Sequence, residues 1–164
     1  MKGPLVLLGL ALALGVPNAL VLHRERVLAT GTPMLLELAP VDPRSLIQGD
    51  YMRLDYAMTR ELAARTEGWP RTGRIVVVLD PAGVARFVRR HDERTPPGAG
   101  EHVLTYRRGR GGIRIGTDAF HFQEGEAPRY AGARYGELRV APSGTSVLVG
   151  LRDSTGARLG ARRE

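Results

Sequence analysis

The sequence predicts a mainly β (α+β) protein: a small antiparallel β-barrel or sandwich with one or two short helices, preceded by an N-terminal transmembrane helix. Three observations favour this class. Residues 3–22 carry no charged side chain. Residues 50–58 alternate between apolar and polar side chains, which is the period of a half-buried strand. The run 75–79 is apolar on both faces, which is typical of a central strand.

The uncharged N-terminal run, residues 3–22, has the length that a helix needs to cross the hydrocarbon core of a bilayer. A cleaved signal peptide is the main alternative, because Lys2 precedes the run and Ala13-Leu14-Gly15 forms a small-residue site within it. A buried helix of a soluble domain is a third alternative. We favour an uncleaved signal anchor, since the apolar stretch continues beyond that site. Residues 1–30 are therefore expected to form an anchor and a juxtamembrane segment.

Length and composition bound the rest of the chain. Its 164 residues suit the anchor, one β-rich domain at 31–152 and a basic C-terminal tail at 153–164, which is expected to be frayed. Without cysteine, the chain has no disulfide framework and no cysteine-based metal or thiol chemistry. The formal charge of +7 favours acidic partners such as anionic lipid headgroups, nucleic acid or an acidic protein surface. The abundance of Arg, Ala and Gly is equally typical of a GC-rich genome.

The stretch 42–56 holds the densest group of candidate functional residues. Asp42-Pro43 predicts a turn, and Gly49 is suited to end a helical turn over residues 45–48. From Asp50 onward, the alternation predicts a strand whose core-facing side chains are Met52, Leu54, Tyr56 and Met58. The outward side of this strand carries Tyr51, Arg53, Asp55 and Ala57. A candidate recognition edge consists of Asp50, Tyr51, Arg53 and Asp55, with Arg44 nearby.

Within this stretch, Gly49-Asp50-Tyr51-x-x-Leu54-x-Tyr56 is identical to the signature of the bacterial GDYXXLXY proteins, and the chain resembles that family. Residues 38–46 and a second block, residues 122–125 and 134–140, are also similar to the family. The resemblance covers most of the chain after Leu22, apart from residues 59–112. It implies a small membrane-anchored bacterial protein, often encoded beside a multi-span membrane protein, with no assigned activity.

The charges beside the anchor give the orientation only weakly, because Lys2 lies before it and Arg24 and Arg26 lie after it. The very short N-terminal tail and the resemblance favour an N-terminus inside the cell. We therefore expect a single-pass protein of the bacterial inner membrane whose domain faces the periplasm or the exterior. The expected partners are the lipid bilayer, through residues 3–22, and a multi-span membrane protein.

The remaining sequence predicts short strands and two short helices, without an internal repeat. Thr59 is expected to cap a helix over 59–65. Asp80-Pro81-Ala82-Gly83 is expected to connect 74–79 and 84–91 as a hairpin. The other expected elements are strands at 33–41, 102–107, 135–142 and 145–151, and a helix at 128–134.

The most basic segment, residues 107–114, interleaves four arginines with three glycines. Arginines on a flexible backbone suit phosphate groups, as in nucleic-acid binding. The alternative is a glycine-rich hairpin tip whose arginines are solvated. We favour the alternative because no aromatic residue is interleaved with the arginines, and nucleic acid is therefore not an expected partner.

Catalytic chemistry finds little support in the sequence. Ser45 lies shortly before Gly49-Asp50, as in signal-peptidase-like proteases, but that mechanism needs a lysine base and Lys2 is the only lysine. The histidines at 23, 91, 102 and 121 lack the close spacing of metal ligands, and His121, between two phenylalanines, is expected to be a strand residue. We assign no catalytic residue, no metal and no cofactor, and enzyme activity is not favoured.

Two groups of charged residues and tyrosines remain as candidate binding residues, since arginine and tyrosine most often anchor protein interfaces. The first group is Asp42, Arg44, Gly49, Asp50, Tyr51 and Asp55, and the second is Gln123, Glu124, Tyr130, Arg134 and Tyr135. We predict that the two groups lie together as one polar surface of an accessory or binding subunit; otherwise, each group braces a turn. The alternative function is a small hydrolase or ligand-binding enzyme that uses Asp50, Tyr51 and Glu124.

Overall fold

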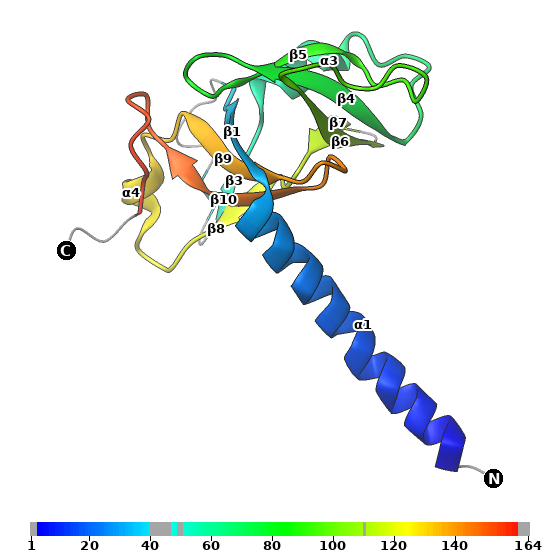
Figure 1. Cartoon of the computed structure of the whole chain (residues 1–164). Coiled ribbons are helices and arrows are strands. Elements are labelled where there is room, and N and C mark those ends of the chain that lie inside the picture. Colours follow the sequence, from blue (N-terminus) through cyan, green and yellow to red (C-terminus); the bar gives the residue numbers. More distant parts are fainter. Residues whose placement is uncertain (1–2, 40–46, 49–50, 110, 161–164) are drawn as a thin grey trace.

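The computed structural model describes residues 3–39, 47–48, 51–109 and 111–160, and it shows a mainly β protein with a projecting N-terminal helix (Figure 1). The helices are α1 (Gly3–Thr30), α3 (Ala57–Ala63) and α4 (Ala127–Tyr130). The strands are β1 (Thr32–Glu37), β2 (Ile47–Gln48), β3 (Tyr51–Arg53), β4 (Thr72–Leu79), β5 (Ala85–Arg90), β6 (Glu101–Gly109), β7 (Gly112–Ile115), β8 (Ala119–His121), β9 (Tyr135–Val140) and β10 (Ser146–Arg152). The predicted class, mainly β with short helices, is confirmed.

The described strands pair antiparallel in three open sheets. The strand orders are β5-β4-β6-β7, β1-β9-β10 and β2-β3-β8. Isolated bridges join Leu35 to Val84 and Leu38 to Tyr56, so β1 and the residues after it link the sheets. The sheets curl around a common interior without closing into a barrel (Figure 1).

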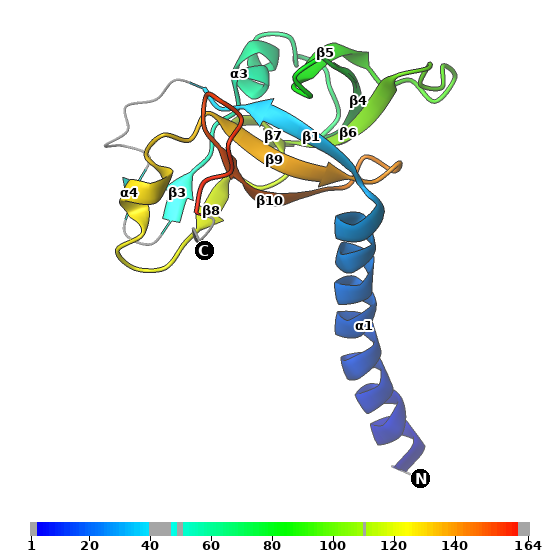
Figure 2. The same ribbon diagram turned by 60° about the vertical axis from the view of Figure 1, so that its left-hand side comes forward.

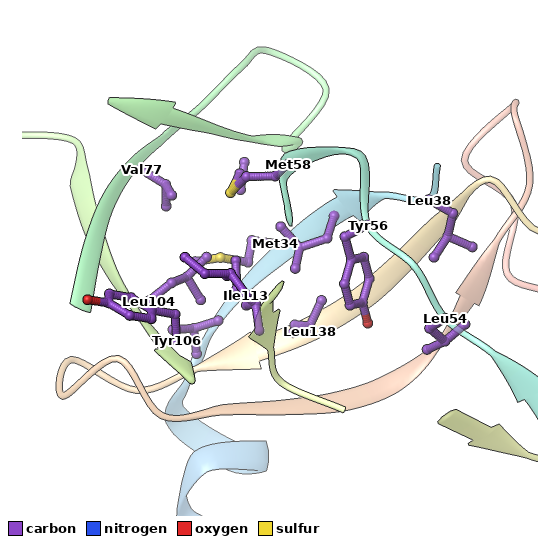
Figure 3. Packing of buried hydrophobic residues seen from close by; sticks show 14 of the residues in the cluster. Met34, Leu38, Leu54, Tyr56, Met58, Val77, Leu104, Tyr106, Ile113 and Leu138 are labelled. Atoms are coloured by element: carbon purple, nitrogen blue, oxygen red, sulfur yellow. The ribbon is translucent and has the colours of Figure 1, made fainter. Parts of the chain in front are cut away.

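The hydrophobic core fills the space between the curled sheets (Figure 3). Met34 lies on β1, Leu104 on β6 and Leu138 on β9, and each is at most 2% exposed. Burying a side chain of this size stabilises the fold by about 1.5–3 kcal/mol. The predicted core-facing set of the central stretch is confirmed, because no member is more than 8% exposed: Met52, Leu54, Tyr56 and Met58.

The start of α3 differs from the sequence prediction in two respects. The predicted strand runs to Met58, but the helix already begins at Ala57, with Tyr56 as its N-cap residue. Thr59 does not cap the helix, because its hydroxyl donates to the Tyr56 carbonyl oxygen at 2.7 Å. Thr59 is buried, and a buried threonine hydroxyl is commonly satisfied by a carbonyl oxygen of the preceding turn.

Two predicted hairpins are confirmed. β4 and β5 are joined by the turn at Asp80, whose Oδ1 accepts hydrogen bonds from the backbone N–H groups of Ala82 (3.0 Å) and Val84 (2.9 Å). β6 and β7 pair from Tyr106↔Ile115 to Gly109↔Gly112. His121 is a strand residue, as predicted, at the end of β8. The helix expected at 128–134 is shorter and earlier, at Ala127–Tyr130.

Helix α1 leads into β1 without a linker. The Gly31 N–H donates to the Val27 carbonyl oxygen at 2.9 Å, and the Arg139 guanidinium donates to the Gly31 carbonyl oxygen at 3.2 Å. A Cβ at Gly31 would lie 3.0 Å from the Val140 backbone nitrogen, so the end of α1 lies directly against β9. Beyond this contact, α1 projects away from the domain (Figure 2). In the described ranges, no helix is sufficiently long and apolar to cross a membrane.

The C-terminal segment differs from the frayed basic tail expected from residue 153. Residues 153–160 fold back onto the domain, and the Leu159 N–H donates to the Leu151 carbonyl oxygen at 2.8 Å. The Asp153 carboxylate holds this turn by accepting from the N–H groups of Thr155 (2.8 Å) and Ala157 (3.0 Å). Arg158 pairs with Glu137 at 3.8 Å, so its charge is directed to the domain.

Candidate functional site

The signature residues occupy two different environments. Leu54 and Tyr56 lie in the core (Figure 3), whereas Tyr51 is exposed on β3. The predicted site residues Asp42, Arg44, Gly49 and Asp50 lie outside the described residues. Of the described signature residues, Leu54 and Tyr56 are therefore structural, and Tyr51 is at the surface.

Tyr56 links the two sequence blocks that carry the family resemblance. Its ring packs against Gly136 of the second block, where a Cβ would lie 3.1 Å from a ring carbon of Tyr56. The Tyr56 hydroxyl donates to the Thr117 carbonyl oxygen at 3.4 Å, a long hydrogen bond. Burial, assisted by the nearby Asp118 charge, raises the pKa of Tyr56 far above that of a free tyrosine. These properties make Tyr56 a core residue and not a reactive group.

Tyr51 lies beside the end of β8. In the antiparallel register of β3 and β8 it is opposite His121, and the two rings are 5.8 Å apart and tilted by 42°. Cross-strand neighbours on one face of a sheet interact directly, so the backbone pairing places these rings together. His121 in turn lines an open cleft between β8 and α4.

This β8–α4 cleft has a volume of about 520 Å³ and is lined by His121, Phe122, Gln123, Glu126, Arg129, Tyr130 and Gly160. Its apolar base consists of aromatic rings that pack on one another. The Tyr130 ring is stacked on Phe122, with centroids 5.3 Å apart, and meets the edge of Phe120 at 5.0 Å. Gly160 lies against the same tyrosine, because its Cβ would be 2.7 Å from the Tyr130 Cζ.

The polar rim of the cleft is held by the short helix α4. The Arg129 guanidinium donates to the Glu126 carboxylate at 2.5 Å, and the two residues are one turn apart. The Glu126 N–H also donates to the Gln123 carbonyl oxygen at 3.0 Å, which fixes the chain between β8 and α4. The cleft thus offers a carboxylate, a guanidinium, an amide and an imidazole around an aromatic base.

The described candidate residues are brought together only in part. Gln123 and Tyr130 line the cleft, and Tyr51 contacts it through His121. Asp55 instead accepts a hydrogen bond from the Arg60 Nε at 2.7 Å, which braces the start of α3. The other three, Glu124, Arg134 and Tyr135, do not line the cleft.

Arg134 and Tyr135 belong to the junction of β1, β9 and β10. The Arg134 carbonyl oxygen accepts from the Leu38 N–H at 2.9 Å, and its own N–H donates to the Arg152 carbonyl oxygen at 2.7 Å. Tyr135 begins β9, paired with Glu37 on one side and Arg152 on the other. For these residues and for Asp55, the alternative that each braces a turn describes the geometry better than a shared surface.

Several cleft residues were not among the sequence candidates: His121, Phe122, Glu126, Arg129 and Gly160. The spacing of Glu126, Arg129 and Tyr130, at i, i+3 and i+4, could have indicated one face of a helical turn. No local pattern marks Gly160, because its contact with Tyr130 forms only when the C-terminal segment folds back. Among the described residues, no three His, Asp or Glu side chains are grouped as metal ligands.

A buried carboxylate outside the cleft was also missed. Glu137 on β9 is 8% exposed and receives two hydrogen bonds from Arg152, at 3.0 and 3.1 Å. These hydrogen bonds, with the charges of Arg152, Arg158 and Arg139, lower the pKa of Glu137 although burial opposes the shift. Arg152 and Arg158 both pair with this carboxylate, so Glu137 has a structural role.

The fold and the cleft define a class of protein, a small antiparallel β domain that carries a projecting helix and an open, aromatic-based polar cleft. The chain belongs to the family described as GDYXXLXY protein, whose sequence profile matches residues 13–151. No curated protein and no solved structure matches the chain. The family match confirms the resemblance carried by the signature and assigns no activity.

Proposed function

We propose that this chain is a membrane-anchored accessory subunit of a bacterial membrane protein complex. In this proposal α1 is the anchor, the β domain faces the periplasm or the exterior, and the β8–α4 cleft docks an extramembrane segment of a multi-span partner. The observation that carries the proposal is the exposed apolar surface of α1.

Helix α1 stands clear of the domain in both views (Figures 1 and 2). Seven large apolar side chains on it are 53–61% exposed: Leu10, Leu12, Leu14, Val16, Leu20, Val21 and Leu22. They point in several directions around the helix, since successive residues are about 100° apart. A helix that is apolar all round requires an apolar environment, such as lipid or the helices of a partner.

The position and chemistry of the cleft support its role as the docking site. β8 and α4 lie at the same end of the domain as the exit of α1, and the β4–β5 hairpin lies at the far end (Figures 1 and 2). A partner segment that leaves the membrane near α1 would therefore meet the cleft first. An aromatic base with a rim of Gln123, Arg129 and His121 suits a peptide, which has apolar side chains and backbone polar groups.

The anchor is tested by fractionation of cells that express the full chain. We expect the native protein to stay with the membranes after an alkaline wash, and a Leu12→Glu, Leu14→Glu variant to move to the soluble fraction. The matched control is Val78→Glu, Val88→Glu, which adds the same two negative charges in place of two exposed apolar side chains of the β domain. Native protein in the soluble fraction would contradict the proposal.

The docking role is tested by photo-crosslinking in intact membranes. A photoreactive amino acid at Gln123, in the cleft, is compared with one at Arg94, an exposed residue after β5. We expect a covalent product with a multi-span membrane protein, identified by mass spectrometry, from position 123 only, and its loss when Arg129→Ala is added. The same product from position 94 would show that the crosslink reports proximity and not docking.

A further inference from the structure

The end of the largest sheet carries a group of arginines that the docking role does not use. We define the arginine end as Arg71, Arg90, Arg107, Arg108 and Arg114, which come from four neighbouring chain segments. All five residues are exposed. In the described part of the chain, the ion pair found for this group is Arg114 with Asp118 at 2.9 Å. Arg74, next to the group, pairs with the exposed Glu93 at 3.2 Å.

Strand pairing forces these like charges together. Arg107 is directly opposite Arg114 in the β6–β7 register. The Arg108 N–H donates to the Arg71 carbonyl oxygen at 2.7 Å, which continues the β4–β6 register and places these two residues opposite each other. Like charges that are directly opposite in a sheet destabilise it. The two pairs lie on opposite faces of the sheet, because successive side chains of a strand alternate, and Arg71 and Arg108 are on the face of Tyr106. An anion on that face would balance the charges of Arg71 and Arg108.

Arg90 completes the group from the other side of β4. It is opposite Ile75, which shares the core-facing side of the sheet with Tyr106 and Leu104. Arg90 and Arg108 are both close enough to Tyr106 for their charges to lower its pKa, although burial raises that pKa more. Arg71, Arg90 and Arg108 therefore surround the end of the core where Tyr106 lies.

Tyr106 is a second, independent sign of a polar ligand at this end. Its side chain is fully buried, and within the described residues its hydroxyl is the buried side-chain polar atom without a hydrogen-bond partner. The hydroxyl lies over Gly73, where a Cβ would be 2.5 Å from it, and Trp69 packs on the ring with centroids 5.3 Å apart. A buried hydroxyl without a partner is unusual in a native protein and commonly indicates a missing group.

We propose that the arginine end binds phosphate groups, held by Arg71, Arg90 and Arg108 beside Tyr106. Guanidinium groups match phosphate oxygens in two-point contacts, and arginine is preferred over lysine where such recognition occurs. A Cβ at Gly109, Gly111 or Gly112 would meet no atom within 4 Å, so no other described segment packs on these glycines next to Arg108. The phosphate can belong to a soluble polyphosphate or to a lipid headgroup, since both present the same oxygens.

Trp69 gives this site a built-in reporter, because it is the only tryptophan in the chain and packs on Tyr106. The full chain, kept in a neutral detergent, is titrated with sodium tripolyphosphate at low salt. We expect a saturable change in Trp69 emission, a higher Tm and weaker binding as salt is added. An Arg71→Gln, Arg108→Gln variant should bind at least about tenfold more weakly.

The control variant Arg24→Gln, Arg53→Gln removes the same charge from α1 and β3, and we expect binding within about twofold of the native value because neither residue is at the site. Equal weakening in both variants would overturn the proposal, as would an equal response to citrate, a polyanion without phosphate, at the same ionic strength. If the first variant does not fold, Arg90→Gln replaces it, with the same expectation of weaker binding.

A second arm distinguishes the two sources of phosphate. The chain is reconstituted in vesicles of phosphatidylcholine, with and without phosphatidylglycerol, and Trp69 emission is compared with that of the Arg71→Gln, Arg108→Gln variant. A response to phosphatidylglycerol without a response to tripolyphosphate assigns the site to lipid headgroups, and the reverse assigns it to a soluble phosphate. The absence of both responses overturns the proposal.

Discussion

The largest and the smallest sheet differ in how firmly they are built. β4 and β6 pair over seven residues, and their core-facing side chains, such as Ile75 and Leu104, are fully buried. β3 and β8 pair over three residues, and this pairing ends at the exposed Tyr51 and His121. Regions with few buried contacts open at a lower free energy than sheet centres, and binding sites are commonly built there. The difference teaches that one short signature can extend from the core, where Tyr56 lies, to the exposed edge of a small sheet, where Tyr51 lies.

The largest expected effect separates the two tyrosines of the signature. Tyr56→Ala should lower the free energy of unfolding by about 3–5 kcal/mol, because it removes a buried aromatic ring from the core. Tyr51→Ala should lower it by less than about 1 kcal/mol, because that ring is exposed. Urea unfolding of both variants measures the difference. Equal losses would show that the small sheet is as firmly built as the core.

The next effect tests the charge of Glu137, which is buried in the β1-β9-β10 sheet. Glu137→Gln should cost about 1–3 kcal/mol at pH 7, because Arg152 and Arg158 lose their carboxylate partner. The fold lowers the pKa of Glu137 below its usual 4.5, so its contribution is complete above pH 4.5 and is lost as pH falls through the folded-state pKa.

The stabilities of native protein and Glu137→Gln should therefore converge as the pH is lowered below 4.5. Glu93→Gln is the matched control, since this side chain is 86% exposed in its pair with Arg74 and should contribute less than about 0.5 kcal/mol. A pH-independent difference between native protein and Glu137→Gln would show that the variant acts through packing and not through charge.

An effect of similar size tests how the C-terminal segment supports the cleft. Gly160→Ala should lower stability by about 1–3 kcal/mol, because the residue has a φ of +75° and its new methyl group would press on Tyr130. Gly156→Ala has a similar φ of +83° and open space around it, so it reports backbone strain alone. Thermal unfolding of the two variants should give the larger loss for Gly160→Ala. The same loss in both would mean that the Tyr130 contact adds nothing.

The smallest effect concerns one hydroxyl in the core. Tyr56→Phe should cost less than about 1 kcal/mol at neutral pH, because the hydrogen bond to Thr117 is long. Since burial raises the folded-state pKa of Tyr56, the native protein should lose stability as pH rises above 10.0, where the unfolded chain ionises. The variant should lose less over that range in alkaline unfolding experiments. Identical pH profiles would contradict this account.

Local pattern predicted much of the fold. The alternation from Met52 gave the correct buried face, and the turn at Asp80 gave the correct hairpin, because both depend on neighbouring residues. The predicted start of α3 was too late, because the prediction made Thr59 the N-cap residue. Thr59 is instead buried, and its hydroxyl donates to the Tyr56 carbonyl oxygen. This burial depends on residues that are distant in the sequence. The folded segment 153–160 was missed for the same reason, because its contacts to Leu151 and Tyr130 come from tertiary structure.

The site was predicted less well than the fold. Tyr51, Gln123 and Tyr130 were correctly placed near one another, although about seventy residues separate β3 from β8 and α4. Side-chain type could identify the tyrosines, but only the strand register shows that Tyr51 meets His121. Asp55 and Arg134 are also charged residues of the kind found in binding sites, but their hydrogen bonds brace the chain. Residue type alone does not distinguish a binding role from a structural role.

The direct passage from α1 into β1 has a mechanical consequence. Gly31 is hydrogen-bonded both to Val27 in the helix and to Arg139 in the domain. A rotation of the helix about its axis is therefore expected to rotate the domain with it. The direction in which the cleft faces around the axis of α1 is therefore set by the rotation of α1 about that axis. Each residue inserted into or removed from α1 would rotate the cleft by about 100° around the helix axis. Insertion or removal of a whole helical turn would restore the direction of the cleft and change its distance from the N-terminus of the helix.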